Sequence, residues 1–182
     1  MIVLETDRLI IRESSGQDFS RIYCMMLSES KENENSASYG EEAGLHPGRT
    51  IRDTVSEDEN EELEKYLAYI HTVYSVFGFG LWTVCLKNDP SCIIGRCGLQ
   101  PIADDNSPLG RIELGYLIDK RWRGQGYASE ACRAILRYAF EKLEIEEVYV
   151  QIPADNTPSV SLAQKLGFDR VTEVWWVRRN PE

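Results

Sequence analysis

The chain has 182 residues, of which 42% are hydrophobic, and its formal net charge at neutral pH is -10. This length suits a single globular domain with its own hydrophobic core. No apolar run approaches the roughly 18 residues that a membrane-spanning helix needs, so we expect no membrane segment. The acidic balance disfavours nonspecific nucleic-acid binding, and it suits a cationic partner and plain solubility equally well.

The N-terminus and the cysteines indicate the compartment. Met1–Glu5 lacks the basic start and the long apolar run of a secretory signal. The five cysteines form no Cys-x-x-Cys pair, and all except Cys24 lie within apolar patterns. We therefore expect reduced thiols in a cytoplasmic protein, with neither a disulfide framework nor a bound metal. Neither His46 nor His71 is placed to activate a cysteine, which disfavours a nucleophilic thiol.

The first half of the chain contains helical and strand patterns on either side of a polar segment. The expected elements are a strand over 8–12, a helix over 16–27, a helix from an N-cap at Ser56 to Gly78, and hairpin strands over 79–86 and 92–99. The polar segment over 28–55 is rich in Glu, Asn, Ser and Gly, which predicts a mobile loop.

The second half reads as strands alternating with helices. After a turn-rich loop over 104–110, the expected elements are a strand over 112–118, a helix over 129–143, a strand over 147–152, a helix from an N-cap at Thr157 to Gly167, and a strand over 169–178. A strand, a helix and a strand in succession imply parallel pairing through a right-handed crossover. We therefore predict one α/β domain over 1–182, with a mixed central sheet of about six to seven strands and helices on both faces. The tryptophans of the last strand suit either the core or a homodimer surface.

The most informative stretch is Arg-Trp-Arg-Gly-Gln-Gly-Tyr-Ala at 121–128, between a predicted strand and a predicted helix. Gly124 and Gly126 let the backbone bend and approach a ligand closely. The unpaired N–H groups at a helix start favour phosphate, and Arg121 and Arg123 add positive charge. A glycine-rich connection without a ligand fits the spacing equally well. The stretch matches neither the dinucleotide fingerprint nor a Walker A loop.

Several stretches, in the right order, resemble the GNAT family of N-acetyltransferases. Arg-x-x-Gly-x-Gly at 121–126 resembles the cofactor motif of that family, and 156–159 with 165–168 resembles its second motif, Asn-x-x-Ser ending in Gly-Phe. The opening, 5–12, and the Glu-Leu-Gly-Tyr segment at 113–116 are similar to the RimJ/RimL-type branch. The resemblance implies the GNAT fold and acetyl-CoA as the cosubstrate.

The resemblance also implies where acetyl-CoA binds. Its pantetheine arm would lie where the strands over 116–118 and 148–152 part, and its diphosphate would lie on the N–H groups of 123–128. The implied cofactor-binding residues are Leu117 and Ile118 through their backbone, Arg121, Trp122, Arg123, Gly124, Gln125, Gly126, Tyr127 and Ala128 in the turn, and Asn156 and Ser159 beside the arm. Helix capping by Asn156 and an exposed hydroxyl at Ser159 are alternative roles for this last pair.

The implied reaction is direct attack of an amine on a thioester. Glu113 is the candidate base, because apolar surroundings would raise its pKa, whereas pairing with a neighbouring arginine is the alternative. Some family members carry Glu where this chain has Gln151, and many carry a tyrosine acid where it has Ala163. Either the thiolate leaves unaided or another hydroxyl helps, in which case Tyr116 is the candidate acid, and backbone N–H groups at 116–117 would hold the oxyanion.

The expected function is acetyl transfer to a primary amine, which is either a protein N-terminus or a small amine such as a polyamine, an amino sugar or a drug. The family likeness is weakest over 28–62, which we expect to be a flexible acceptor-side segment whose acidic residues attract a cation. Two other functions stay open. The departures at Gln151 and Ala163 suit a non-catalytic acyl-CoA-binding domain, and the turn at 121–128 alone suits a nucleotide-binding module.

Overall fold

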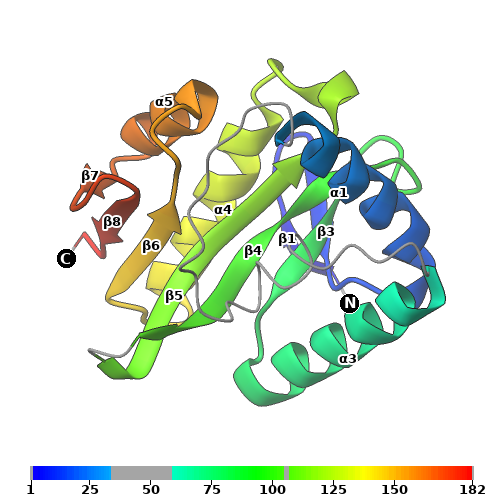
Figure 1. Ribbon diagram of the computed structural model, residues 1–182, viewed down its shortest axis with the longest axis horizontal. Helices are drawn as coiled ribbons and strands as arrows, with labels where there is room; N and C mark the ends of the chain where they lie inside the picture. Colours follow the sequence, from blue (N-terminus) through cyan, green and yellow to red (C-terminus); the bar gives the residue numbers. More distant parts are fainter. Residues whose placement is uncertain (1, 34–58, 105–106, 182) are drawn as a thin grey trace.

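The computed structural model describes residues 2–33, 59–104 and 107–181. Its helices are α1 (Phe19–Asn33), α3 (Glu59–Phe77), α4 (Tyr127–Glu141) and α5 (Thr157–Lys165), with short 3-10 turns η1 (Gly16–Asp18) and η2 (Lys120–Trp122). Its strands are β1 (Ile2–Glu5), β2 (Leu9–Arg12), β3 (Leu81–Leu86), β4 (Ile93–Asp104), β5 (Ser107–Ile118), β6 (Glu147–Gln151), β7 (Asp169–Arg170) and β8 (Trp175–Arg179). They form one sheet in the order β1-β2-β3-β4-β5-β6-β8-β7 (Figure 1).

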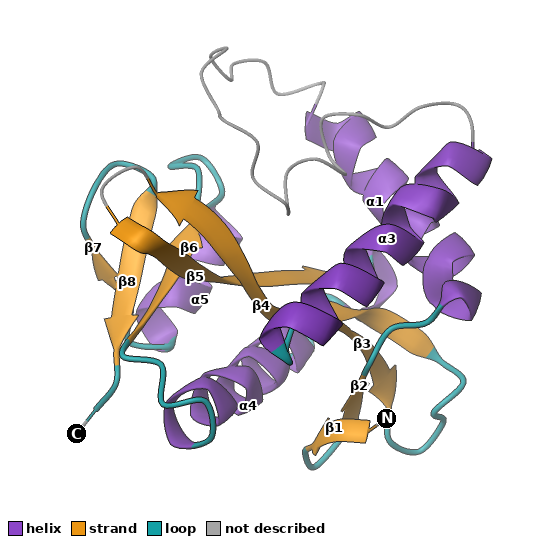
Figure 2. Cartoon of the chain, turned by 90° about the horizontal axis from the view of Figure 1, so that it is seen from below, coloured by secondary structure: helices purple, strands orange, loops and turns teal. Residues whose placement is uncertain are grey.

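Helices cover both faces of the sheet, as predicted. Figure 2 shows α1 and α3 on one face and α4 on the other. Helix α4 buries Ala131, Ile135 and Ala139, which recur every four residues and so line one side of the helix. Residues of α5 join the same hydrophobic cluster. On the opposite face, α1 and α3 pack around Leu117 of β5, so this strand contacts both helical layers.

The sheet has eight strands, where six to seven were expected. One extra strand is β1, which pairs antiparallel with β2. The other arises because the strand expected over 169–178 is split into β7 and β8. The N–H groups of Val171 and Thr172 both donate to Trp175 O, which closes a turn between the two strands. The Thr172 hydroxyl also accepts from Trp175 N–H, a side-chain contact that favours a turn over an extended chain.

Several predicted boundaries also shift. Helix α1 continues to Asn33, beyond the expected end at residue 27. The loop expected over 104–110 is mostly strand, because β4 reaches Asp104 and β5 begins at Ser107. Helix α5 is capped by Asn156 instead of Thr157. The rest of the predicted mobile loop, residues 34–55, and the N-cap predicted at Ser56 lie outside the described residues.

A buried ion pair fixes the start of α1 against β2. Two nitrogens of Arg12 lie 2.7 Å and 2.8 Å from the two carboxylate oxygens of Asp18, whose residue is 3% exposed. Burial acts to raise the pKa of Asp18, but hydrogen bonds from Arg12 and Ser15 outweigh it and lower the pKa. The carboxylate therefore stays charged inside the fold.

This ion pair predicts acid sensitivity. Because folding lowers the pKa of Asp18, its contribution is complete above the ordinary aspartate pKa of about 3.9 and is lost as the pH falls through the folded-state value. We expect Asp18→Asn to lower the free energy of unfolding by about 2 kcal/mol at pH 7. The difference from the wild type should shrink below about pH 4 in urea titrations. Asp7→Asn, at an exposed position, is the control. A difference that is independent of pH would contradict this role.

Candidate active site

Strands β5 and β6 pair in parallel and then part. Their registered contact is Glu113 opposite Tyr149. Beyond it, β5 continues to Ile118 along β4, while β6 continues to Gln151 along β8 on its other side. A wedge therefore opens at the carboxyl ends of two parallel strands, with Glu113 at its closed end. Ligands of α/β sheets commonly bind at such a position.

The backbone groups that face the wedge belong to Tyr116 and Ile118. Asp119 N–H donates to Ile94 O across to β4, at 2.8 Å. Successive residues of a strand alternate in direction, so Leu117 also turns its N–H and C=O toward β4. This differs from the expectation that Leu117 offers unpaired backbone groups. The carbonyl of Ile118 already accepts from Arg123 Nε at 2.8 Å.

The glycine turn at the open end of the wedge has a shape that suits a ligand. Gly124 and Gly126 have positive φ angles of 73° and 84°, which residues with side chains rarely adopt. Gly126 is the N-cap of α4, so the turn ends where the helix begins. A Cβ at Gly124 would meet nothing within 4 Å, so its backbone is open to close approach. These features fit a diphosphate on the N–H groups at the start of α4.

The side chains of the turn largely serve to hold its shape. Asp119 accepts from Arg121 N–H at 2.9 Å and also pairs with the guanidinium of Arg121. Burial acts to raise the pKa of Asp119, but hydrogen bonds from Arg121 and Arg21 outweigh it and hold the pKa well below its usual range. The rings of Trp122 and Tyr127 meet edge to face, with their centroids 6.0 Å apart. The arginines expected to attract phosphate are therefore partly engaged within the protein.

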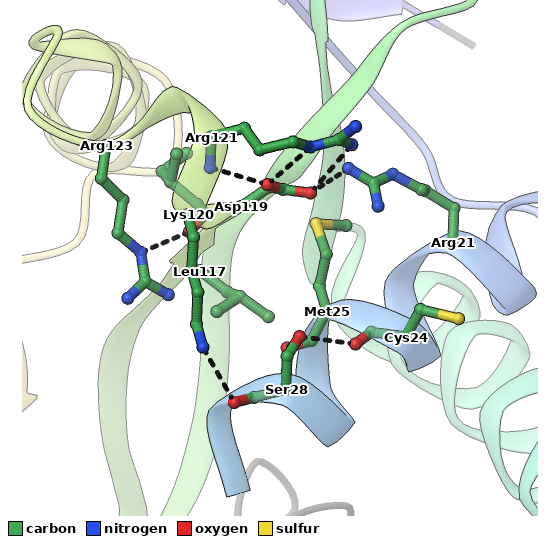
Figure 3. Close-up of a pocket in the computed structure, with 10 residues that line it drawn as sticks. Arg21, Cys24, Met25, Ser28, Leu117, Asp119, Lys120, Arg121 and Arg123 are labelled. Atoms are coloured by element: carbon green, nitrogen blue, oxygen red, sulfur yellow. Dashed lines mark hydrogen bonds and ion pairs between the residues drawn. The ribbon is translucent and has the colours of Figure 1, made fainter. Parts of the chain in front are cut away.

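A cleft of about 210 Å³ lies between α1 and this turn. Its lining residues are Arg21, Cys24, Met25 and Ser28 of α1 together with Leu117, Ile118, Asp119, Lys120, Arg121 and Arg123. Figure 3 shows Asp119 between Arg21 and Arg121, and Lys120 reaching Ser28 O. The Asp119 carboxylate thus connects α1, on one face of the sheet, to the turn that leads into α4, on the other face. Cys24 is exposed, unlike the buried thiols of Cys85, Cys97 and Cys132.

Arg8 joins the N-terminal segment to the glycine turn. Its Nη1 donates to Gln125 O at 3.0 Å and its Nε donates to Glu130 Oε2 at 2.7 Å. The guanidinium carbon lies 4.3 Å from the centroid of the Tyr127 ring. The Thr6 hydroxyl donates to the other oxygen of Glu130 at 2.6 Å. No local sequence pattern indicates a role for Arg8, because its contacts join segments that lie far apart in the chain.

Glu113 is half-buried and has neutral partners. Its Oε2 accepts from Gln100 Nε2 at 2.8 Å, and its Oε1 accepts from Gln151 N–H at 3.3 Å. Within the described residues these partners are an amide and a backbone N–H, not the arginine considered as an alternative. Gln151 therefore contributes to the site through its backbone. The pattern of the sequence gave no signal for Gln100.

Tyr116 lies on the opposite face of β5 from Glu113, because side chains alternate along a strand. Its hydroxyl donates to Ser159 Oγ at 2.8 Å, which links β5 to the start of α5. Asn156 accepts from Ser159 N–H at 3.2 Å and so has the capping role that was considered for it. Ala163 is 3% exposed within the hydrophobic core.

A family model described as an acetyltransferase (GNAT) domain matches residues 8–169. The chain belongs to the GNAT acetyltransferase family. An uncharacterised N-acetyltransferase of Bacillus licheniformis, p20, is 35% identical to this GNAT chain over 78 residues, which are 43% of the chain and 42% of that relative. The acetyltransferase from Agrobacterium tumefaciens superposes with a TM-score of 0.68 at 22% identity, covering 100% of this chain and 95% of that one. RimL, a ribosomal alpha-N-protein acetyltransferase in complex with coenzyme A, superposes with a TM-score of 0.69 at 14% identity, covering 98% of each.

The family membership confirms the predicted GNAT fold and an acetyl-CoA-dependent acetyltransferase. The likeness of this GNAT chain to RimL is a likeness of fold. Within 2–33, 59–104 and 107–181, none of the helices combines the length and the apolar character needed to cross a bilayer. The same residues contain no cluster of three or more His, Cys, Asp or Glu side chains arranged for a metal. The functions assigned to individual site residues stay predictions.

Proposed function

We propose that this GNAT acetyltransferase transfers the acetyl group of acetyl-CoA to a primary amine by direct attack on the thioester. The observation that carries the proposal is the wedge, which has Glu113 at its closed end and the Gly124–Gly126 turn at its open end. The six residues from Glu113 to Ile118 span about 17 Å of strand, over which an extended arm of the cofactor would run.

The cofactor would be held mainly by backbone groups. The N–H groups of 123–128 suit the diphosphate, with Arg121 and Trp122 shaping the turn. Tyr116 and Ile118 have the backbone groups that suit the amides of the pantetheine arm, as in the addition of a strand to a sheet edge. Leu117 would contribute its buried side chain. Asn156 and Ser159 would border the arm at the start of α5.

Glu113 would act as the base. A lysine-type amine with a pKa of about 10.4 is neutral in roughly one molecule per thousand at pH 7, whereas a protein α-amine with a pKa of about 8 is neutral in about one in ten. A carboxylate at the closed end of the wedge would remove the proton as the amine attacks. The N–H of Tyr116 would stabilise charge on the carbonyl oxygen. The Tyr116 hydroxyl would approach from the other face and protonate the leaving sulfur.

The acceptor would reach Glu113 from the face that α1 and α3 cover, since Glu113 and Leu117 project to that face. The net charge of -10 would favour a cationic amine, either a protein N-terminus or a small amine. Residues 28–62 include the end of α1 and the start of α3, and we propose them as the acceptor-side segment of a single domain over 1–182. We further propose a cytoplasmic location for the protein, on the basis of its free cysteines.

The decisive experiment is a thiol-release screen with acetyl-CoA against N-terminal peptides, polyamines and aminoglycosides, run beside equilibrium binding of CoA. Release that depends on an amine supports the proposal. Tight CoA binding without release across the panel supports the non-catalytic acyl-CoA-binding domain that Gln151 and Ala163 leave open. Protection from thermal unfolding by ATP or NAD and not by CoA would point to a nucleotide-binding module.

A further inference from the structure

Gln100 carries a buried hydrogen-bond acceptor beside the candidate base. It lies directly opposite Glu113 in the β4–β5 pairing and is 5% exposed. Its Nε2 donates to Glu113, whereas its Oε1 has no hydrogen-bond partner among the described residues. A buried amide oxygen without a partner costs on the order of 1–3 kcal/mol. A ligand that donates a hydrogen bond to such an atom therefore recovers this free energy on binding.

The hydrogen-bonding chemistry of Gln100 and Glu113 determines which amide atom of Gln100 faces the carboxylate. An ionised carboxylate only accepts hydrogen bonds, so the amide of Gln100 must turn Nε2 toward Glu113. Oε1 is bonded to the same carbon as Nε2. It therefore lies on the same amide group whose Nε2 contacts the Glu113 carboxylate.

A glycine follows Glu113 on the same face of β5, and a neutral tyrosine hydroxyl lies near Glu113. On the same face of β5, two residues after Glu113, a Cβ at Gly115 would lie 2.9 Å from Leu81 Cδ2 and 3.9 Å from Gln100 Nε2, so this position suits only glycine. The hydroxyl of Tyr69 on α3 is buried and has no hydrogen-bond partner in the described part of the chain. Burial raises the pKa of Tyr69 to about 12, with the charges of Arg96 and Glu113 also acting on it. Tyr69 therefore stays neutral, which leaves Glu113 and Gln100 as the strong acceptors.

We propose that Gln100 Oε1 accepts a hydrogen bond from the attacking amine and selects primary amines; this inference rests on the proposed function. A neutral primary amine has two N–H bonds and one lone pair. One N–H donates to Glu113, which takes that proton, and the other donates to Gln100. The lone pair forms the C–N bond while the C–S bond breaks, and the sulfur takes the electron pair and then a proton.

This arrangement separates primary amines from groups with a single X–H bond. A secondary amine or an alcohol that donates to Glu113 has no hydrogen left for Gln100, so the buried oxygen remains unpaired. The penalty of 1–3 kcal/mol corresponds to a preference of about 5- to 150-fold for the primary amine. Gln100 is thus assigned as a substrate contact that sets specificity.

The test compares the best primary amine from the screen with its N-methyl analogue, using the full chain. For Gln100→Met we expect kcat/KM to fall about 10- to 100-fold for the primary amine and much less for the N-methyl analogue, so that the preference collapses. Exposed Gln164→Met on α5 should leave both values unchanged. If Gln100→Met does not fold, Gln100→Asn keeps an amide but withdraws it by one methylene, and we expect the same loss of preference.

Other outcomes distinguish a failure of this inference from a failure of the proposed function on which it rests. Should Gln100→Met slow both amines by the same factor, Gln100 would only orient Glu113, and the inference would be overturned while the transferase remained. If the wild type shows no amine-dependent release at all, the proposed function and this inference fall together. CoA affinity, measured by calorimetry, should be the same in wild type and variant, and a large change would also overturn a role in the amine contact.

Discussion

Glu113→Gln is expected to lower kcat by about 100- to 10,000-fold while leaving the affinity for CoA unchanged. The substitution keeps the shape of the side chain and an oxygen that can accept from Gln151 N–H. It removes the ability to take a proton at the closed end of the wedge. Steady-state thiol release at saturating acetyl-CoA measures the loss, and calorimetry measures CoA binding.

The control for this result is Glu147→Gln. Glu147 lies on β6, and its carboxylate accepts from Arg179 and from the Tyr149 hydroxyl, so its hydrogen-bond partners differ from those of the Glu113 carboxylate. The Glu147→Gln substitution removes one carboxylate from the same sheet and should preserve kcat. An unchanged kcat in Glu113→Gln would exclude Glu113 as the base. Weakened CoA binding in that variant would instead indicate that Glu113 holds the strands in position.

Arg8→Met is expected to raise the Kd of acetyl-CoA about 10- to 100-fold, with kcat at saturation nearly preserved. Burial acts to raise the pKa of Glu130, but hydrogen bonds from Thr6 and Arg8 outweigh it and lower the pKa, so this carboxylate is negative in the first turn of α4. Without the guanidinium, that charge would oppose a diphosphate at the same helix end. The carbonyl of Gln125 would also lose its tether.

Two further variants interpret the Arg8 result. Arg137→Met removes an exposed arginine from α4 and should leave the Kd unchanged. Adding Glu130→Gln to Arg8→Met should restore part of the affinity, because the uncompensated charge is then absent. If kcat falls while the Kd is constant, the contact of Arg8 with the turn does not serve cofactor binding.

The strand, the turn and the helix after it could be predicted because local signals specify them, whereas the parting of the two strands was implied by the resemblance to the GNAT family. An apolar run before two glycines predicts a strand that ends at a turn, and the periodicity after them predicts the helix. The contact of Gln100 with Glu113 could not be found in this way. It depends on an irregularity between Ile102 and Asp104 that shifts the register of the β4–β5 hairpin. Extended regularly from the Asp104–Ser107 pair, the hairpin would set Gln100 against Arg111.

The difference between the expected and the observed direction of the Leu117 backbone groups has a similar origin. Hydrophobicity predicts that a strand exists but does not reveal which alternate N–H groups face which neighbour. One hydrogen bond, from Asp119 N–H to Ile94 O, decides this for the whole end of β5. The role of Arg8 was missed for a related reason, since it depends on contacts between the N-terminal segment and residues 125–130.

The position of Asp119 has a consequence for how the two substrates bind. Its carboxylate holds Arg21 of α1 and Arg121 of the turn together, so neither can move without changing the electrostatics of the other. An acceptor that displaces α1 must therefore alter the affinity for CoA, and by linkage CoA must alter the affinity for that acceptor by the same factor. We therefore expect coupled affinities for CoA and for any acceptor that displaces α1.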